Sequence, residues 1–333
     1  MVLFDMQRIS EILGSINPWK VATVFLLLVN VKCLPFVWHY RIFSPIVRAA
    51  WRKSPCPALV SNADIKTPTV FLPFITTTYA PLLECDYNLH KSNSTYFTDL
   101  DASRSHLLSS LCYNGLRTVE RELAAEGKLG MMAAIIGSVT TSFKKEIRIF
   151  QQYEVWSRIL SWDRKWLYIV TYFVQKGSVE PGEFAMGTLP KDHVPGSAHS
   201  KHKSKVTPPV IFATAVSKYV FKKGRLTVPP ERLLRASGLL RASGLLGHGP
   251  STGGSSTSAP DMKSKDMEGT NCSSGSDVYG MIEKERLRGM KYVESWNKLD
   301  GLNEEFLRED ETIDGIVALG RSSDITRDIF LFA

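Results

Sequence analysis

Hydrophobic positions change their spacing several times along the chain, and each change marks an expected element. The stretch at 67–87, TPTVFLPFITTTYAPLLECDY, is rich in β-branched and aromatic residues, which favours a strand. From about Tyr96 to Leu123, apolar residues recur three and four positions apart. This spacing predicts one helix of roughly 30 residues that begins between Ser92 and Tyr96 and ends near Gly127.

Strand-like segments follow the predicted helix at 131–147, 153–162, 165–175 and 210–228. Asp163 and Arg164 have the character of a tight turn, so the first three of these segments are expected to form an antiparallel meander. One strand, a long helix and four more strands make an α+β pattern, in which an antiparallel sheet wraps around one central helix.

The remaining segments set the expected domain organisation. The main domain is predicted at 67–233, with an irregular basic insert at 176–208 that lacks periodicity. A low-complexity linker rich in Ser and Gly follows at 234–277. The last part, 278–333, is expected to hold an amphipathic helix and a tail.

The most apolar run of the chain, VATVFLLLVNV at 21–31, continues after Lys32 to Tyr40. Because about 20 apolar residues cross a bilayer, the pattern predicts a transmembrane or membrane-associated helix at 21–43, after an N-terminal segment at 1–20. An interfacial or buried helix and a cleaved signal peptide are the alternatives. The excess of Arg and Lys after the run predicts a single-pass membrane protein whose main domain lies on the cytosolic side.

Composition excludes some classes of protein. With 44% apolar and 22% charged residues among 333, the chain can bury a core and is not wholly disordered. The formal charge of +8 is too modest an excess to indicate nucleic acid as a partner. The five cysteines are odd in number and form no C-x-x-C pair, which argues against a disulfide framework and a structural zinc site. No metal or other cofactor is predicted.

Functional side chains are densest where the first strand gives way to the long helix. Within eleven residues the sequence holds Asp86, Asn88, His90, Ser92, Asn93 and Tyr96. Free backbone amides at a helix start can hold an anion or a carbonyl oxygen. A carboxylate can act as a nucleophile or activate water while such amides stabilise an oxyanion, so the cluster is suited to acyl transfer.

At these positions the chain resembles the hotdog-fold acyl-CoA thioesterases of the 4-hydroxybenzoyl-CoA thioesterase group, whose motif is D-x-x-G-H-x-x-N-x-x-Y. Asp86, His90, Asn93 and Tyr96 fall in this register, while Leu89 stands where the motif has glycine. The segment DYNLHKSNSTYFTDLDASR resembles fungal thioesterase-like proteins and thioesterase superfamily member six-like proteins more closely than it resembles that group. The resemblance covers about 67–228.

The resemblance implies a role for each matching residue. Asp86 would be the catalytic carboxylate, His90 and Tyr96 would orient the site, and Asn93 would lie near the thioester carbonyl. Substrate-binding positions are expected at Asn88, Ser92, Ser94 and Thr95, whose amides open the helix. With leucine at 89, the backbone is expected to approach the thioester less closely than glycine would allow.

The implied reaction is hydrolysis of an acyl-CoA or acyl-carrier-protein thioester, in fungal secondary or lipid metabolism, by a homodimer. One alternative is a hotdog interaction protein without turnover. Another is a hotdog dehydratase, whose acid on the central helix could be Asp99, Glu120 or Glu122. The chain has no phosphate loop, which argues against nucleotide chemistry.

Overall fold

The computed structural model describes residues 17–51, 67–179, 209–240 and 274–298. The predicted basic insert at 176–208, the linker at 234–277 and the tail therefore lie largely outside the described residues, as does most of the segment at 1–20. The fold and the candidate site belong to the unit that ends at Leu287.

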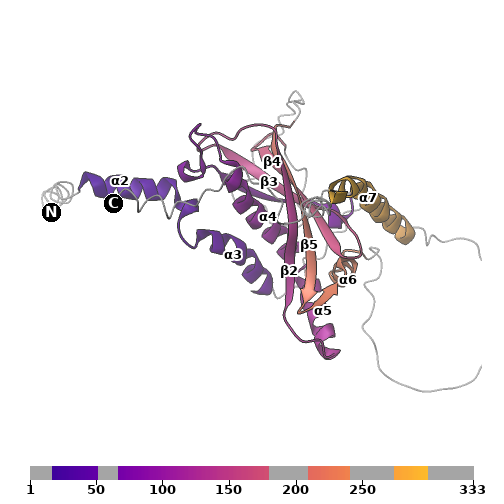
Figure 1. The fold of residues 1–333 in the computed structure, drawn as a ribbon. Helices are drawn as coiled ribbons and strands as arrows, with labels where there is room; N and C mark the ends of the chain where they lie inside the picture. The colour runs from indigo at the N-terminus through magenta and orange to yellow at the C-terminus, as the bar shows by residue number, and fades with distance from the viewer. Residues whose placement is uncertain (1–16, 52–66, 180–208, 241–273, 299–333) are drawn as a thin grey trace, which may run out of the picture. The chain divides into compact units, whose positions relative to one another are not determined.

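The described strands form one antiparallel sheet in the order β1-β3-β4-β5-β2, with the short β6 paired to β5 (Figure 1). The strands are β1 (Phe74–Tyr79), β2 (Met132–Phe143), β3 (Gln152–Trp162), β4 (Trp166–Gln175), β5 (Ile211–Lys223) and β6 (Leu226–Val228). The predicted meander holds for β3 and β4, but β2 lies beside β5 and not beside β3.

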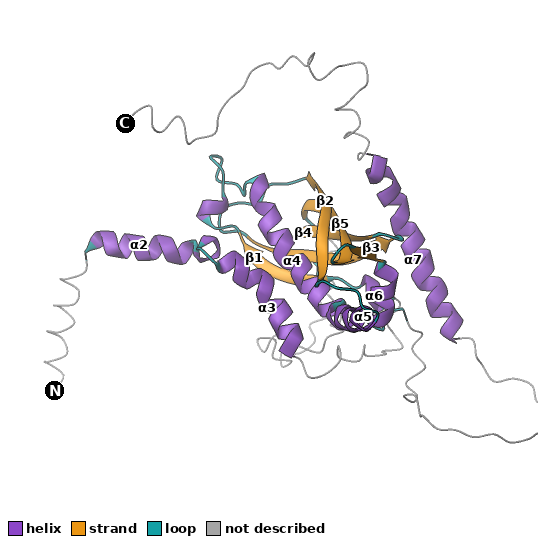
Figure 2. Ribbon diagram, turned by 60° about the horizontal axis from the view of Figure 1, so that its bottom comes forward, coloured by secondary structure: helices purple, strands orange, loops and turns teal. Residues whose placement is uncertain are grey.

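The predicted long helix is interrupted once. It consists of α4 (Tyr96–Leu111) and α5 (Tyr113–Ala125), which are separated at Cys112, where φ is −110° and ψ is −10°. Leu100 and Leu107 of α4 are fully buried against strand residues of the sheet. Figure 2 shows α4 lying across the sheet, so the expected α+β arrangement of a sheet around a central helix is confirmed.

The prediction of a single-pass membrane protein is wrong. Among the described residues, every helix falls short of a membrane crossing in length or in apolar character. The span expected at 21–43 is divided between α2 (Pro18–Val29) and α3 (Val37–Trp51), with a short 3-10 turn, η1 (Val31–Cys33), between them. The 12 residues of α2 extend about 18 Å, well below the roughly 30 Å of a bilayer core.

Polar residues cause this interruption. The side chain of Asn30 donates to the carbonyl oxygen of Leu26 at 2.9 Å and accepts from the amide of Leu83 at 2.8 Å. Lys32, which would lie in the middle of a membrane span, is instead buried within the protein. Phe36 then has a positive φ of 67°, which turns the chain before α3.

α3 lies beside α4 in the same unit (Figure 2). The hydroxyl of Ser105 on α4 donates to the carbonyl of Ile42 on α3 at 2.6 Å. The N-terminal segment is therefore joined to the central helix by packing and by polar contacts.

Two further helices follow β6 in the described part of the chain, α6 (Pro230–Ala236) and α7 (Ser274–Asn297). Arg286 of α7 donates to the carbonyl of Trp162 at 3.0 Å, and Ser161 donates to the carbonyl of Arg286 at 2.8 Å. These bonds attach the first part of α7 to the end of β3.

Candidate active site

A tight loop between two 3-10 turns, η3 (Leu82–Glu84) and η4 (Asn93–Thr95), carries the predicted site. Cys85 and Lys91 form an antiparallel bridge across its base. The amide of Asp86 donates to the carbonyl of His90 at 2.8 Å, and the amide of Ser92 donates to the carbonyl of Glu84 at 2.8 Å. These bonds fix both ends of the loop at the start of α4.

Asp86 lies at the first end of this loop, directly after Cys85, with an exposed side chain. Its Oδ1 accepts from the amide of Asn88 at 2.9 Å and from the amide of His90 at 3.3 Å, which makes an Asx-type turn. Among the described residues, the hydrogen bonds of this carboxylate involve Oδ1 alone. The group is therefore held in place by the loop while Oδ2 is available to a substrate or a water molecule.

Leu89 adopts the left-handed backbone conformation, with φ 58°. This is the region that glycine occupies without steric cost. The loop therefore keeps, at Leu89, a backbone conformation that glycine favours. The expectation that the backbone approaches the thioester less closely stays a prediction. The leucine side chain is 55% exposed and so has room outside the loop.

At the start of the central helix, two backbone amides have no acceptor among the residues that the structure describes. The amide of Thr95 donates to the carbonyl of Ser92 at 3.0 Å, and the amide of Ser92 is bonded to Glu84. The first two amides of the turn, those of Asn93 and Ser94, have no acceptor within the helix. Of the amides at 92–95 that were expected to lie near a thioester carbonyl, those of Asn93 and Ser94 are therefore the ones available to bind it.

A cleft of about 590 Å³ opens at this loop and gathers most of the predicted site. Its lining includes five of the eight predicted site residues, namely Asp86, Asn88, His90, Asn93 and Tyr96. Ser92, Ser94 and Thr95 are not among the lining residues. The side chains of Ser92 and Thr95 instead make local bonds, to Ser94 Oγ at 3.1 Å and to the carbonyl of Ser92 at 2.7 Å.

The opposite wall of the cleft was not predicted. It consists of the segment that follows β2, with the lining residues Phe143, Lys144, Lys145, Glu146 and Arg148. The sequence interpretation placed this segment inside a strand at 131–147, whereas β2 ends at Phe143. The signal was the charged run KKEIR, which breaks the apolar pattern of the strand.

This wall is fixed to the sheet and to the Asp86 loop. The amides of Lys144 and Lys145 both donate to the carbonyl of Phe212, at 2.8 and 3.0 Å. Arg148 bridges to His90 through the backbone, and His90 Nε2 lies 3.6 Å from Glu146 Oε2. The positive charges of Lys144, Lys145 and Arg148 therefore line the cleft together with the carboxylates of Asp86 and Glu146.

Tyr96 is mainly part of the core. It is 2% exposed, and its ring packs edge-on against Phe143 and Phe173 at centroid distances of 5.0 and 4.9 Å. Burial, with the charge of Asp99, raises the pKa of its hydroxyl well above the usual range. The phenol therefore stays protonated at physiological pH and forms the floor of the cleft.

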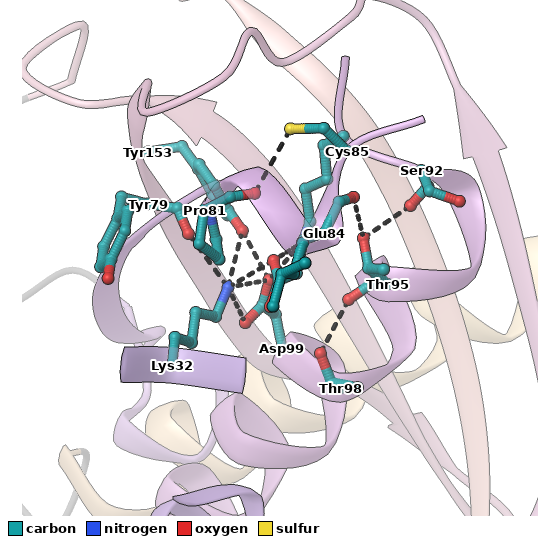
Figure 3. Close-up of polar contacts among 12 residues, drawn as sticks. Lys32, Tyr79, Pro81, Glu84, Cys85, Ser92, Thr95, Thr98, Asp99 and Tyr153 are labelled. Carbon is teal, nitrogen blue, oxygen red and sulfur yellow. Dashed lines mark hydrogen bonds and ion pairs between the residues drawn. The ribbon is translucent and has the colours of Figure 1, made fainter. Parts of the chain in front are cut away.

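Beneath the loop lies a cluster of buried ionisable side chains that the sequence did not reveal (Figure 3). Glu84 and Lys91, at the two ends of the loop, form an ion pair with each other. Asp99 of α4 lies 3.0 Å from Lys91 and 2.8 Å from Lys32. Arg41 of α3 completes the cluster at 2.7 Å from Asp99.

The cluster changes the proton affinities of its members. Burial alone would raise the pKa of the Asp99 carboxyl, but the charges of Lys32, Lys91 and Arg41 outweigh it and hold this pKa well below its ordinary value. Burial lowers the pKa of Lys32, and Asp99 opposes this effect. Burial and the charge of Asp99 raise the pKa of Tyr153, which donates to Asp99.

The acids that a dehydratase would need are already engaged. Asp99 is fully buried in the cluster, Glu120 accepts from the amide of Met132 at 3.2 Å, and Glu122 pairs with Arg232 at 3.0 Å. None of the three is among the residues that line the cleft. This arrangement argues against the dehydratase alternative.

The chain matches the profile of the thioesterase-like superfamily over residues 80–210, which includes the loop, the central helix and the strands β2, β3 and β4. It is 40% identical over 229 residues to the probable thioesterase atnL of Emericella nidulans, covering 66% of this chain and 71% of that protein. It is 31% identical over 297 residues to the thioesterase poxG of Penicillium oxalicum, covering 87% of each chain. The chain therefore belongs to the thioesterase-like superfamily.

The resemblance to hotdog-fold thioesterases is thus confirmed, and thioester hydrolase is the enzyme class to which the family points. The probable thioesterase YbaW of Escherichia coli, a solved structure, aligns with 50% of this chain and 96% of its own at 11% identity and a TM-score of 0.32. The family assignment rests on the sequence relatives and does not depend on this alignment.

Proposed function

We propose that the protein hydrolyses an acyl-CoA or acyl-carrier-protein thioester in the cleft between the Asp86 loop and the basic segment 144–148. The observation that carries this proposal is a cleft lined by a fixed carboxylate, by Asn93 and by a cationic wall, with the free amides of Asn93 and Ser94 in the turn beside it. A carboxylate and oxyanion donors are the equipment of acyl transfer. The named relatives come from fungi, which supports a fungal setting.

In the proposed reaction, Asp86 acts on the thioester carbonyl either through water or directly. As a general base, its carboxylate takes a proton from a water molecule whose oxygen attacks the carbonyl carbon. The amides of Asn93 and Ser94, with the Asn93 side chain, hold the resulting oxyanion. Collapse of the intermediate breaks the C–S bond and releases a carboxylic acid and a free thiol, to which the proton passes.

As a nucleophile, Asp86 would instead form an acyl anhydride with loss of the thiol, and water would then hydrolyse that anhydride. The exposed carboxylate of Asp86 suits either route. His90, beside Glu146, would orient the loop at the edge of the cleft.

The experiment that tests this proposal measures the release of free thiol from a panel of acyl-CoA substrates. We expect turnover by the wild-type protein and a loss of about 10²-fold or more in kcat for Asp86→Asn. Glu126→Gln is the control, because Glu126 is an exposed acid that does not line the cleft. If the wild-type protein cleaves no substrate faster than Asp86→Asn does, an interaction protein without turnover becomes the better account.

The cationic wall is proposed to bind the phosphates that CoA and the carrier-protein arm share. The double substitution Lys144→Gln with Lys145→Gln should raise KM for acyl-CoA and leave KM unchanged for an acyl N-acetylcysteamine thioester, which lacks phosphate. The effect on acyl-CoA should shrink as salt is added, since salt screens exposed charges. An equal rise in KM for both substrates would contradict this role.

We also propose that the protein is a homodimer that pairs along β2. In the described part of the chain, β2 pairs only with β5, so its other edge offers free backbone groups beyond Met132, whose amide donates to Glu120. Ile135 and Ile136 on this strand are 44% and 41% exposed. Light scattering should give twice the chain mass, and Ile135→Lys should lower it while Leu226→Lys on β6 should not. A monomeric wild-type protein would contradict the proposal.

A further inference from the structure

The members of the buried cluster come from distant parts of the chain. Lys32 belongs to η1 in the N-terminal segment, Glu84 and Lys91 lie at the two ends of the Asp86 loop, and Asp99 lies on α4. The side chains of Lys91 and Asp99 are fully buried, and those of Lys32 and Glu84 are 5% and 8% exposed. Such a group of charges is stable only if its members are paired.

Lys32 is the member that joins the other parts. Its Nζ donates to Glu84 Oε2 at 2.8 Å, to Asp99 Oδ2 at 3.0 Å and to the carbonyl of Tyr79 at 3.1 Å. Figure 3 shows this ammonium group pointing between the two carboxylates, beneath Tyr153. The N-terminal segment therefore reaches the loop end, the central helix and the end of β1 with one charged group.

The cluster is connected directly to the position of Asp86. Glu84 holds the loop through its side chain, which pairs with Lys91, and through its carbonyl, which accepts from the Ser92 amide. The same carbonyl accepts from the hydroxyl of Thr95 at 3.3 Å, in the turn that carries the free amides. A shift of Glu84 would therefore move the carboxylate and the oxyanion donors relative to each other.

We propose that Lys32 is a positioning residue for the proposed reaction. It comes from outside the segment that carries the site, and its charge holds Glu84 and Asp99 together. In this way it sets the spacing between the Asp86 loop and the start of the central helix. This inference rests on the proposed function for its kinetic consequence and on the geometry of the cluster for its structural consequence.

The first test compares the kinetics of full-length variants that fold. Lys32→Met should lower kcat for acyl-CoA on the order of 10- to 100-fold, the scale of a small misplacement of reacting groups, with KM nearly unchanged. Lys20→Met is the matched control, because Lys20 is an exposed lysine of the same segment and should keep wild-type kinetics. Wild-type kcat in a folded Lys32→Met protein would overturn the proposal.

A compensating variant separates charge balance from lost packing. In Lys32→Met, Glu84 keeps Lys91 as its one remaining cation among the described residues. The double variant Lys32→Met with Glu84→Gln loses one positive and one negative charge, so the cluster keeps its wild-type net charge. We expect this double variant to recover part of the kcat lost in Lys32→Met. If kcat falls further in the double variant, the proposed charge relation is wrong.

Tyr153→Phe provides a second route if Lys32→Met does not fold. It removes the hydroxyl that donates to Asp99 and that lies 3.4 Å from Lys32, without changing any charge. We expect a smaller fall in kcat at unchanged KM. Wild-type kinetics for this variant would overturn the proposal.

Hydrogen exchange followed by mass spectrometry tests the positioning without any substrate. The amides of Asp86, Leu89, Lys91 and Ser92 are all hydrogen-bonded, so exchange at 85–92 should be slow in the wild type and faster in Lys32→Met. Exchange in β3 and β4 should not change. Unchanged exchange at 85–92 overturns the positioning role, whereas faster exchange without thiol release from any substrate overturns only the proposed function.

Discussion

At the scale of single residues, Leu89 shows how the loop tolerates a departure from the family motif. An L-amino acid in the left-handed region costs about 1–2 kcal/mol, which glycine avoids. Glycine in turn loses more backbone freedom on folding, at a cost of about 0.5–1 kcal/mol. The two effects nearly cancel, so leucine can keep the backbone at φ 58° with its side chain in solvent.

Leu89→Gly should therefore change the free energy of unfolding by less than about 1 kcal/mol and should keep kcat. Leu89→Val should lower both, because a β-branched side chain at positive φ is strongly disfavoured. Urea denaturation and thiol release measure the two quantities. A marked loss of kcat in Leu89→Gly would show that the leucine side chain itself contributes to the site.

Sequence spacing predicted the near side of the site because its residues are close in the chain. Asp86, His90 and Asn93 reach the cleft from one loop, and the motif register identifies them. Lys32 could not be assigned, because its partners Glu84 and Asp99 lie 52 and 67 positions away. In the sequence alone, Lys32 is a charged residue within an apolar segment, whereas in the fold its position is determined by tertiary ion pairs.

At the scale of elements, close packing of α5 on α6 depends on Gly115. A Cβ at this position would lie 2.5 Å from the carbonyl oxygen of Leu233 and 2.1 Å from Ser237 Oγ. The backbone of the neighbouring helix would have to move, since no side-chain rotation relieves the contact with the carbonyl. Glycine at 115 therefore sets the distance between the two helices.

Gly115→Ala should lower the free energy of unfolding, because an overpacking cost of about 1–3 kcal/mol outweighs the preference of about 1 kcal/mol for alanine in a helix. Gly280→Ala in α7 is the matched control, since a Cβ there meets nothing within 4 Å. Its free energy of unfolding should stay unchanged or rise. Urea denaturation of both variants tests this, and equal effects would contradict the packing argument.

The order and type of most elements could be predicted from periodicity, but their ends could not. The three-and-four spacing continues through Cys112, so the break between α4 and α5 has no local signal. The end of β2 at Phe143 depends on hydrogen bonds from Lys144 and Lys145 to Phe212, which is distant in the chain. Pairing of β2 with β5 likewise depends on long-range contacts.

At the scale of the whole molecule, the buried cluster links stability to pH. The folded pKa of Asp99 lies well below the ordinary value of 3.8, so on the acid side the unfolded chain binds more protons than the folded one. Stability from this group is therefore fully present above the ordinary value and is lost as pH falls through the folded pKa. The contribution does not change near neutral pH.

The free energy of unfolding should accordingly fall as the pH is lowered below about 4. In Lys32→Met this acid-side fall should be smaller, because one of the cations that depress the pKa of Asp99 is missing. Urea denaturation between pH 7 and pH 2 measures both profiles. Parallel profiles for the two proteins would contradict the assignment of this effect to the cluster.

The central claim is that the Asp86 carboxylate and the amides of Asn93 and Ser94 act on one thioester. The most direct measurement is a crystal structure of the protein with a non-cleavable acyl-CoA analogue. We predict a carbonyl carbon about 3–3.5 Å from Asp86 or from a water molecule bound to it, with the carbonyl oxygen directed at the two amides. An analogue bound with its carbonyl outside this cleft would contradict the account.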